Sequence, residues 1–208
     1  MTEARRLAVR RRRVRLPGWP AELDGLRVAV LSDLHAGAGS IDRDRVQAVV
    51  TAVNRTRPDL VVLLGDYVDA HAAPDEHGEA EDVAATLGGL HAPLGVFGVL
   101  GNHDRARHGP RTLAALERAG VTVLENRAVR TGGLWLAGVS DAASAQPDPG
   151  AALARVPDTE PVIAITHSPD VFPRIPSRVA LTLAGHTHAG QLNVPLLRRL
   201  LVPSRFGA

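Results

Sequence analysis

Short apolar runs alternate with helical patterns through the first half of this chain, and that order strongly restricts the folds open to it. Three runs are predicted strands: 27–32, 60–64 and 95–100. Between the first two, valines recur at helical spacing over residues 43–57, and Pro58 ends that predicted helix. Because the strands are apolar throughout, both of their faces should be buried. This βαβ order predicts an α/β fold with a largely parallel first half.

The second half of the chain has more strand-like runs and fewer helical patterns. Its predicted strands are 121–124, 128–131, 134–139, 162–166 and 179–184. Helices are predicted at 79–90 and 110–119, and loops at 71–78 and 143–150. The excess of strands indicates a second sheet.

Polar residues of the types that bind metals stand where five of the strand-like runs end. In open α/β sheets, ligands bind outside the carboxyl ends of the strands. The five strand ends are Ser32-Asp33-Leu34-His35, Gly65-Asp66-Tyr67-Val68-Asp69, Gly101-Asn102-His103-Asp104, Thr166-His167-Ser168-Pro169-Asp170 and Gly185-His186-Thr187-His188. Taken singly, each motif is also typical of a helix cap or a turn. Their joint occurrence at five strand ends predicts a metal site.

The spacing within the motifs also has a physical meaning. Asp33 and His35 are two residues apart and would point to the same side of an extended backbone, and so would His186 and His188. Each pair is therefore expected to act as a clamp at a strand end. Three motifs begin with a glycine that permits a sharp turn and a close approach of the backbone: Gly65, Gly101 and Gly185.

The residue types narrow the choice of metal. The chain has no cysteine, so thiolate sites and disulfides are excluded. A mixture of carboxylate, imidazole and amide ligands suits Mn, Fe or Zn better than Ca or Mg. Four histidines lie outside the motifs and are expected in solvent-facing loops: His71, His77, His91 and His108.

In this order the five motifs resemble the signature of the calcineurin-like metallophosphoesterase superfamily, over a segment from about residue 25 to residue 194. The resemblance implies an αββα four-layer sandwich, in which two mixed β-sheets are flanked by helices. It also implies metal-dependent hydrolysis of phosphate esters. Similar proteins usually continue past Phe206 and Gly207 with two more strands, so the second sheet is expected to lack these C-terminal strands.

The resemblance gives each motif residue a role. Two divalent metal ions are implied: the first held by Asp33, His35 and His188, the second by Asn102, His167 and His186, and both bridged by Asp66. A hydroxide shared by the two ions would attack the phosphorus atom. His103 resembles the catalytic histidine of the family and Asp69 resembles its carboxylate partner, which would favour the protonated imidazole.

Two departures from the wider family bear on the substrate. The protein Ser/Thr phosphatases have Arg where this chain has Ala70, and Glu where it has Asp104, so a protein phosphatase is not expected. The segment that follows Gly185 resembles the bacterial branch of membrane-associated phosphodiesterases and UDP-2,3-diacylglucosamine pyrophosphatases of lipid A synthesis. This resemblance predicts a phosphodiester or pyrophosphate substrate, which is lipid-linked in some members.

Other functions stay open at this point. A phosphomonoesterase or a nucleotide phosphodiesterase would use the same centre, whereas a non-catalytic scaffold would have lost ligands that this chain keeps. Nucleic-acid cleavage is disfavoured, because two Trp, one Tyr and three Phe offer few stacking platforms. Arg105 and Arg107 are either contacts for the substrate phosphate or water-facing, with the second favoured. The sequence leaves open the native substrate, the metal and the oligomeric state.

The N-terminus is rich in arginine. All 24 basic residues of the chain are Arg, and seven of them lie within the first fifteen positions. We assign residues 1–24 to an arm and residues 25–208 to a single metallophosphoesterase domain. The arm is either a solvated face or a contact for an anionic membrane or a nucleic acid. No apolar run approaches the roughly 20 residues that span a bilayer, and no signal peptide is recognisable. This predicts a cytoplasmic protein, with peripheral membrane association through the arm.

Overall fold

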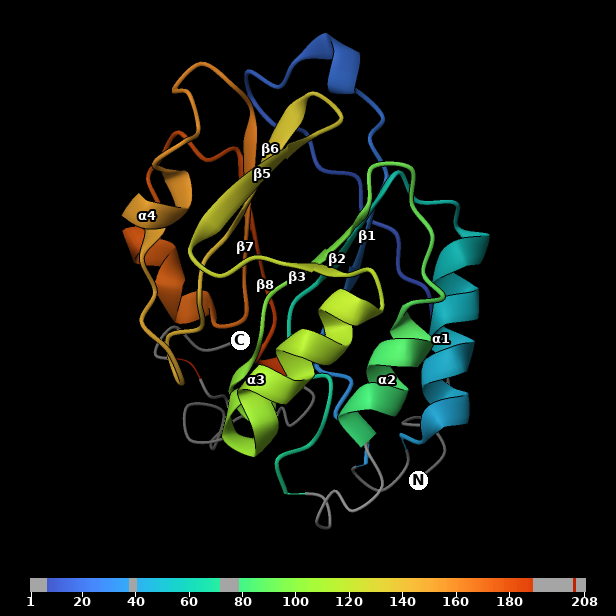
Figure 1. Cartoon of the computed structure of the whole chain (residues 1–208). Helices are drawn as coiled ribbons and strands as arrows, with labels where there is room; N and C mark the ends of the chain where they lie inside the picture. The colour runs from blue at the N-terminus through green and yellow to red at the C-terminus, as the bar shows by residue number, and fades with distance from the viewer. Residues whose placement is uncertain (1–6, 38–40, 72–78, 189–203, 205–208) are drawn as a thin grey trace, which may run out of the picture.

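Two stacked β-sheets with helices on both outer faces form the molecule (Figure 1). The computed structural model describes residues 7–37, 41–71, 79–188 and 204. This arrangement confirms the predicted αββα sandwich. The first sheet is parallel in all of its described strands, whereas the second is mixed. Residues 189–203 and 205–208, on which the expectation about the C-terminal strands falls, lie outside the described residues.

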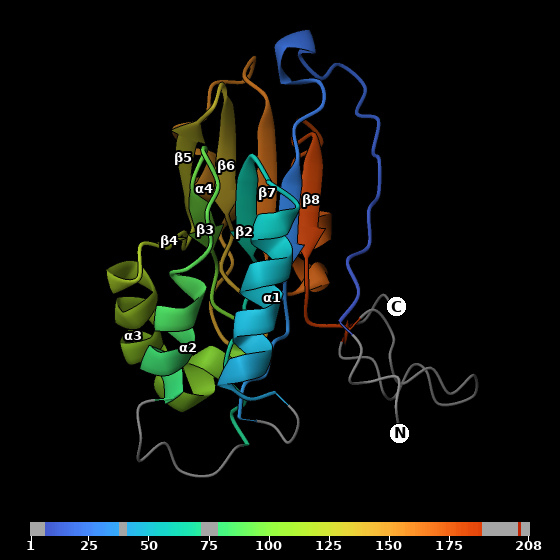
Figure 2. The ribbon, with the colours of Figure 1, turned by 90° about the vertical axis from the view of Figure 1, so that its right-hand side faces the viewer.

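The first sheet follows the βαβ order that the sequence predicts. Its strands are β1 (Val28–Leu31), β2 (Leu60–Leu63), β3 (Val96–Gly98) and β4 (Thr122–Val123), in that spatial order. Its helices are α1 (Arg43–Arg55), α2 (Glu79–Leu87) and α3 (Asn102–Arg118). All three helices cover the same face of this sheet (Figure 2). Because the strands are parallel, their carboxyl ends meet at one edge.

The second sheet has the order β5-β6-β7-β8. Its strands are β5 (Arg127–Thr131), β6 (Leu134–Gly138), β7 (Val162–Thr166) and β8 (Leu181–Ala184). Strands β5 and β6 form an antiparallel hairpin, and β6, β7 and β8 are parallel. The outer face is covered by α4 (Pro149–Leu153), and the 3-10 helices η2 (Ala21–Leu23) and η3 (Pro169–Arg174) complete the described elements.

The central strand β2 shows why the layers stack. Its residues alternate between two apolar cores, because successive side chains of a strand point to opposite faces. Val61 and Leu63 pack against the helices, whereas Leu60 and Val62 pack against the second sheet. All four are fully buried. Because both faces of β2 are buried, this strand requires apolar residues at every position.

Two boundaries differ from the prediction. Helix α3 begins at Asn102 and not near residue 110, so segment 105–110 is helical and not a loop. Pro110, a residue typical of a first helical turn, lies inside this helix, which runs through it. Helix α4 begins within the predicted loop 143–150, where the Asp148 side chain accepts the N–H of Ala151 and caps it.

Candidate metal centre

The seven predicted ligand residues meet where the carboxyl ends of the two sheets come together. Loops after β1 and β2 continue the backbone pairing beyond the strands, since Asp33 N donates to Gly65 O and His35 N donates to Asp66 O. The loop after β8 is tied to β7 in the same way, by Gly185 N and His167 O. Further along, both carboxylate oxygens of Asp33 accept the backbone N–H of His186, at 3.0 and 3.1 Å. The two sheets are therefore joined through the site itself.

The backbone at the ligands is not extended, which corrects the expected clamp geometry. Five ligand residues have a positive φ between 46° and 69°: Asp33, His35, Asp66, His186 and His188. Non-glycine residues in this region carry a cost of order 1–3 kcal/mol each and persist where the surroundings hold them. The hydrogen bonds that continue the sheets supply that constraint. The pair Asp33 and His35 and the pair His186 and His188 still point to one site, because all four residues adopt the left-handed backbone conformation.

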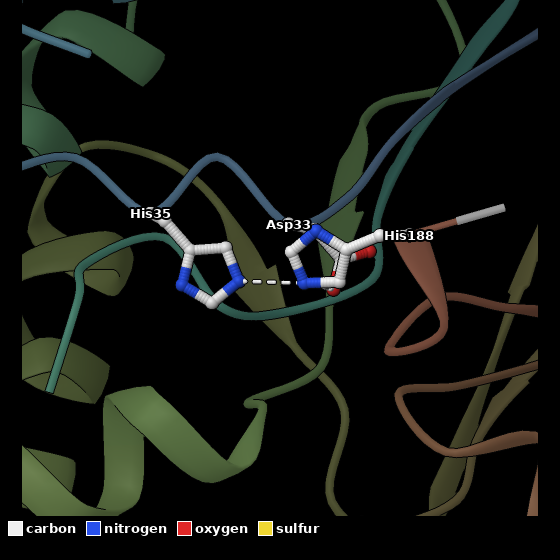
Figure 3. Close-up of side chains that lie close together, drawn as sticks. All are labelled: Asp33, His35 and His188. Carbon is white, nitrogen blue, oxygen red and sulfur yellow. Dashed lines mark hydrogen bonds and ion pairs between the residues drawn. The ribbon is translucent and has the colours of Figure 1, made fainter. Parts of the chain in front are cut away.

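The first ligand group consists of Asp33, His35 and His188, whose ligand atoms lie within 4.8 Å of one another. The Nε2 atoms of the two histidines are 3.1 Å apart, and His188 Nε2 lies 3.6 Å from Asp33 Oδ1 (Figure 3). Burial lowers the pKa of His35, and the neighbouring imidazoles add to this effect although Asp66 opposes it. A neutral imidazole keeps the lone pair that a metal needs.

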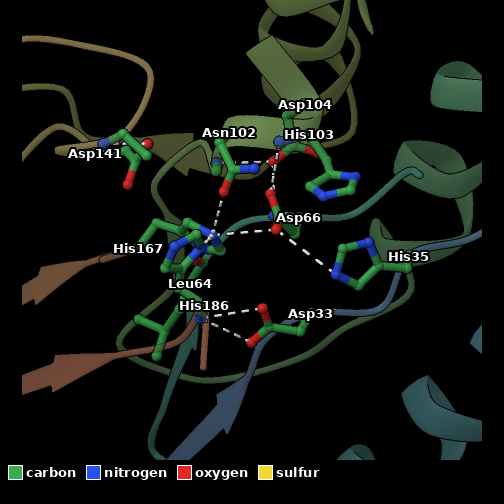
Figure 4. A network of polar contacts seen from close by, with 12 residues as sticks. Asp33, His35, Leu64, Asp66, Asn102, His103, Asp104, Asp141, His167 and His186 are labelled. Atoms are coloured by element: carbon green, nitrogen blue, oxygen red, sulfur yellow. Dashed lines mark hydrogen bonds and ion pairs between the residues drawn. The ribbon is translucent and has the colours of Figure 1, made fainter. Parts of the chain in front are cut away.

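The second group is centred on His167, which is completely buried. Its Nε2 lies 3.1 Å from Asp66 Oδ2, 3.1 Å from Asn102 Oδ1 and 3.0 Å from His186 Nδ1 (Figure 4). Its Nδ1 lies 2.7 Å from Leu64 O, a backbone acceptor that keeps a proton on Nδ1 and turns Nε2 to the site. Burial would lower the pKa of His167, but the hydrogen bond and charge of Asp66 outweigh it and raise the pKa to about 9.

Asp66 connects the two groups. Its Oδ2 lies 3.6 Å from His35 Nε2 and 3.1 Å from His167 Nε2, so one carboxylate oxygen reaches both. Its other oxygen accepts the backbone N–H of His103 at 2.9 Å. Burial alone would raise the pKa of Asp66, yet its contacts with His167 and His103 lower it. A single ionised carboxylate thus faces both sets of donors.

Asp104 holds Asp66 in place, a role that the sequence reasoning missed. This fully buried carboxylate accepts the N–H groups of Asp66 and Tyr67, both at 2.8 Å, and that of Gly101 at 2.9 Å. It thereby fastens the loop after β2 to the first turn of α3. Burial raises the pKa of Asp104 to about 7, although these N–H groups oppose the rise. The signal in the sequence was the capping-box spacing of Gly101 and Asp104.

All three motif glycines are needed for close packing, and a Cβ atom on Gly65 would lie 2.4 Å from Gly101 N. A Cβ atom on Gly101 would lie 2.1 Å from Asp66 Oδ1, and one on Gly185 would lie 1.9 Å from Ser32 Oγ. No heavy atom can approach that closely, so any larger residue would displace the loops that carry Asp66 and His186. The expectation of a close backbone approach is therefore correct, with protein atoms as the neighbours.

His103 lies at the side of the first group. Its ring meets that of His35 edge-on, with 4.5 Å between ring centroids. Its Nδ1 accepts the backbone N–H of Ala70 at 3.0 Å and lies 3.3 Å from Asp69 Oδ1. A neutral ring that accepts from Ala70 carries its proton on Nε2, whereas a protonated ring can donate Nδ1–H to Asp69.

Comparison with known proteins decides the family. The sequence model of the calcineurin-like phosphoesterases matches residues 26–190. The chain belongs to the calcineurin-like phosphoesterase family. Among the relatives of this metallophosphoesterase, the uncharacterized metallophosphoesterase YkuE of Bacillus subtilis is 29% identical over 88% of this chain and 65% of its own length. An uncharacterized metallophosphoesterase of Aquifex aeolicus is 33% identical over 80% of this chain and 64% of its own.

Other relatives are longer proteins. A transmembrane protein with a metallophosphoesterase domain from Danio rerio is 31% identical over 83% of this chain but only 42% of its own length. The chain thus spans less than two thirds of these relatives. Within the part of the chain that the structure describes, no helix is both long and apolar enough to cross a bilayer. Among solved structures, the NAD nucleotidase NadN of Haemophilus influenzae has a TM-score of 0.53 at 14% identity, over 78% of this chain and 38% of its own, which supports the fold alone.

The donor set fits the divalent metals that metallophosphoesterases use. Imidazole nitrogens, carboxylate oxygens and one amide oxygen converge in two overlapping groups around Asp66. Such mixed nitrogen and oxygen donors suit Mn, Fe and Zn. The assignment of each ligand to an ion is taken up under the proposed function.

Residues near the centre depart from some expectations. Arg105 was expected to face water, but it pairs with Glu125, which also accepts the Ser140 hydroxyl. His71 is exposed as expected, yet its ring stands edge-on to His103 with centroids 5.4 Å apart, so it borders the site. His91 is exposed in a loop. His77 and the side chains of Arg107 and His108 lie outside the described residues.

Proposed function

We propose that this metallophosphoesterase hydrolyses a phosphodiester or pyrophosphate bond at a centre of two divalent metal ions. The observation that carries the proposal is the position of Asp66, whose Oδ2 lies within 3.6 Å of donor nitrogens from both ligand groups. Two bound ions would supply an activated water and the positive charge that phosphoryl transfer requires. The rest of the chemistry belongs to residues of this chain.

The ligand residues divide by position. We assign one ion to Asp33, His35 and His188, and the other to Asn102, His167 and His186, with Asp66 shared. The hydrogen bond from His167 Nδ1 to Leu64 O orients one imidazole. The carboxylate of Asp104 accepts the backbone N–H of Asp66 and so holds the loop that carries Asp66. The ligands are thus preorganised by buried hydrogen bonds.

His103 is the proposed acid. In its protonated form the ring can donate Nε2–H to a phosphate oxygen or to the leaving group, and it is left as a neutral imidazole that keeps its second proton on Nδ1. On protonation, Nδ1–H can pair with Asp69, whose Oδ1 lies 3.3 Å away. Asp69 is itself fixed, because its Oδ1 accepts the His71 N–H at 2.8 Å.

The reaction is tested by comparing a bis-aryl phosphate with the corresponding mono-aryl phosphate in the presence of Mn²⁺. We expect faster turnover of the diester, and loss of turnover after chelation that returns when Mn²⁺ is restored. Faster turnover of the monoester would replace the proposal by a phosphomonoesterase. Turnover that survives complete removal of metal would overturn the metal mechanism.

A lipid-linked substrate is the finer part of the proposal, with UDP-2,3-diacylglucosamine as the specific candidate. It is supported by the exposed N-terminal arm, in which the arginines at 10–13 and 15 stand among the exposed apolar residues Leu7, Val9 and Val14. Arginines near an anionic bilayer contribute about 1 kcal/mol each, and apolar side chains add burial. Co-sedimentation should show salt-sensitive binding to anionic vesicles and loss of binding when the five arginines are replaced by Gln. Equal binding to neutral vesicles contradicts the membrane contact.

A further inference from the structure

One buried carboxylate beside the metal centre has no role in the proposed reaction. Asp141 follows β6 and is completely buried. Strand β6 pairs in parallel with β7, which ends at Thr166 just before His167, so Asp141 lies at the same edge of the second sheet as the proposed ligands. Figure 4 draws it together with Asn102, His167 and His186. A buried carboxylate in such a place needs a reason, because its desolvation is costly.

The two oxygens of Asp141 have very different surroundings. Oδ2 accepts three hydrogen bonds from the turn that follows: Ala143 N at 3.1 Å, Ser144 N at 2.9 Å and Ser144 Oγ at 2.7 Å. Oδ1 is buried and has no hydrogen-bond partner. An unsatisfied buried acceptor costs about 1–3 kcal/mol. The hydrogen bonds of the turn account for Oδ2, whereas Oδ1 is a buried acceptor without a donor.

His186 has a ring nitrogen without a protein partner among the described contacts. Its Nδ1 lies 3.0 Å from His167 Nε2, which makes Nδ1 the atom that faces the proposed ion. Among the described contacts, its Nε2 has no partner. His167 differs, because its second nitrogen is held by Leu64 O at 2.7 Å. Histidines that bind metals almost always donate their other ring N–H to a carboxylate, a carbonyl or water.

Asp141 and His186 follow β6 and β8, the two strands that flank β7, so both lie beside His167 at the same edge of the sheet. Burial and the neighbouring His167 lower the pKa of His186, while Asp141 is the carboxylate that opposes this most strongly, ahead of Asp66 and Asp33. Yet Asp141 belongs to none of the described clusters of candidate metal ligands. It is therefore near the imidazole but outside the set of atoms that surround an ion.

We infer that Asp141 is a positioning residue: its free Oδ1 accepts Nε2–H of His186 when the imidazole is seated at the metal centre, and so keeps the Nδ1 lone pair turned to the ion. This inference rests on the proposed metal centre. It assigns to Asp141 the function that Leu64 O performs for His167. Each of these two ligand histidines then has its own acceptor.

Asp141→Asn is a sharp test because the turn dictates how the amide must sit. Three donors surround Oδ2, so the amide oxygen has to occupy that position and the NH₂ group takes the place of Oδ1. A donor then faces the Nε2–H donor of His186. Ser144→Ala is the matched control, because it removes one bond to Oδ2 and leaves Oδ1 untouched.

The protein loaded with Zn²⁺ provides two readouts. Competition with a chelator should show that Asp141→Asn weakens the second Zn²⁺ by about 10- to 100-fold, whereas Ser144→Ala leaves both affinities unchanged. In ¹⁵N-labelled protein, the Nε2–H resonance of His186 should be protected from exchange in the wild type and in Ser144→Ala, and should be lost in Asp141→Asn.

Two outcomes separate the inference from its foundation. If the wild type binds two Zn²⁺ ions and Asp141→Asn matches Ser144→Ala in affinity and spectrum, Asp141 does not position His186 and the metal centre stands. If the wild type binds no pair of ions, the metal centre itself fails. A folding defect in Asp141→Asn is recognised by comparing the unfolding temperatures of the two variants.

Discussion

The two halves of the proposed centre differ in how deeply they are buried. In the group around His167, the side chains of His167 and Asp66 are almost inaccessible, with 0% and 2% exposure, whereas Asn102 and His186 are partly buried. In the other half, His188 is 41% exposed and Asp33 is 11% exposed. The buried half also has fixed hydrogen bonds to backbone groups, such as His167 to Leu64 O. Of the two proposed ions, we therefore expect the inner one to be held firmly and the outer one, beside His35 and His188, to exchange more readily.

Removal of the shared ligand should have the largest effect. Asp66→Ala deletes the only carboxylate, among the described residues, that reaches both halves, so neither ion should be retained and hydrolysis should be abolished. Metal analysis after dialysis checks this result. Asp158→Ala, at an exposed aspartate paired with Arg178, is the control and should retain both ions. Full metal content in Asp66→Ala would end the idea that this residue is the bridge.

Single ligand replacements from each half sharpen the comparison. His188→Ala should lose the outer ion on dialysis and keep about one ion per chain, because the inner group stays intact. His167→Ala should lose the inner ion, and it leaves the buried Asp66 without the nearer of its two imidazole partners. We therefore expect a lower unfolding temperature for His167→Ala than for His188→Ala in differential scanning calorimetry. Equal losses of metal and stability would show that the halves are equivalent.

Replacement of His103 should separate chemistry from metal binding. His103→Ala removes a ring that lies beside His35 without being one of the assigned ligands. We expect unchanged metal content and turnover lowered by about 10²-fold or more. His91→Ala, at an exposed loop histidine, serves as the control and should keep full activity. Full activity of His103→Ala would remove its role as the acid.

The smallest expected effect is a pH dependence confined to the buried half. In the metal-free protein, the pKa of His167 is raised from its ordinary 6.5 to about 9 by Asp66, against the effect of burial. Its protonated form therefore contributes stability that is fully present below pH 6.5 and is lost as the pH rises through about 9. Urea unfolding of the metal-free protein should show this decline from pH 7 to 9.5. His188→Gln should keep the decline and His167→Gln should remove it.

The sequence predicted the fold because both of its main signals are local. Apolar runs such as 60–64 and valines at helical spacing along 43–57 are patterns within a few residues. The gathering of the ligand residues could be expected as well, since the carboxyl ends of parallel strands meet at one edge. The roles of individual ligands and the division into domains stay predictions.

The supporting residues could not be read from the sequence, because their contacts join distant positions. Asp104 accepts the N–H of Asp66, 38 residues away, and His167 contacts Leu64 O across 103 residues. The positive φ of Asp33 and His35 depends on pairing with the loop after β2, which local spacing does not reveal. The first turns of α3, which begin at Asn102, were missed as well, and the N-cap residue Gly101 has no side chain that could signal them.

Crystals of the protein soaked in MnCl₂ would test the central claim directly. An anomalous difference map should contain two peaks about 3.5–4 Å apart, one beside His35 and His188 and the other beside His167 and His186, both in contact with Asp66. The inner peak should be the stronger when MnCl₂ is limiting. A single peak, or two peaks of which only one touches Asp66, would contradict a centre built around a bridging carboxylate.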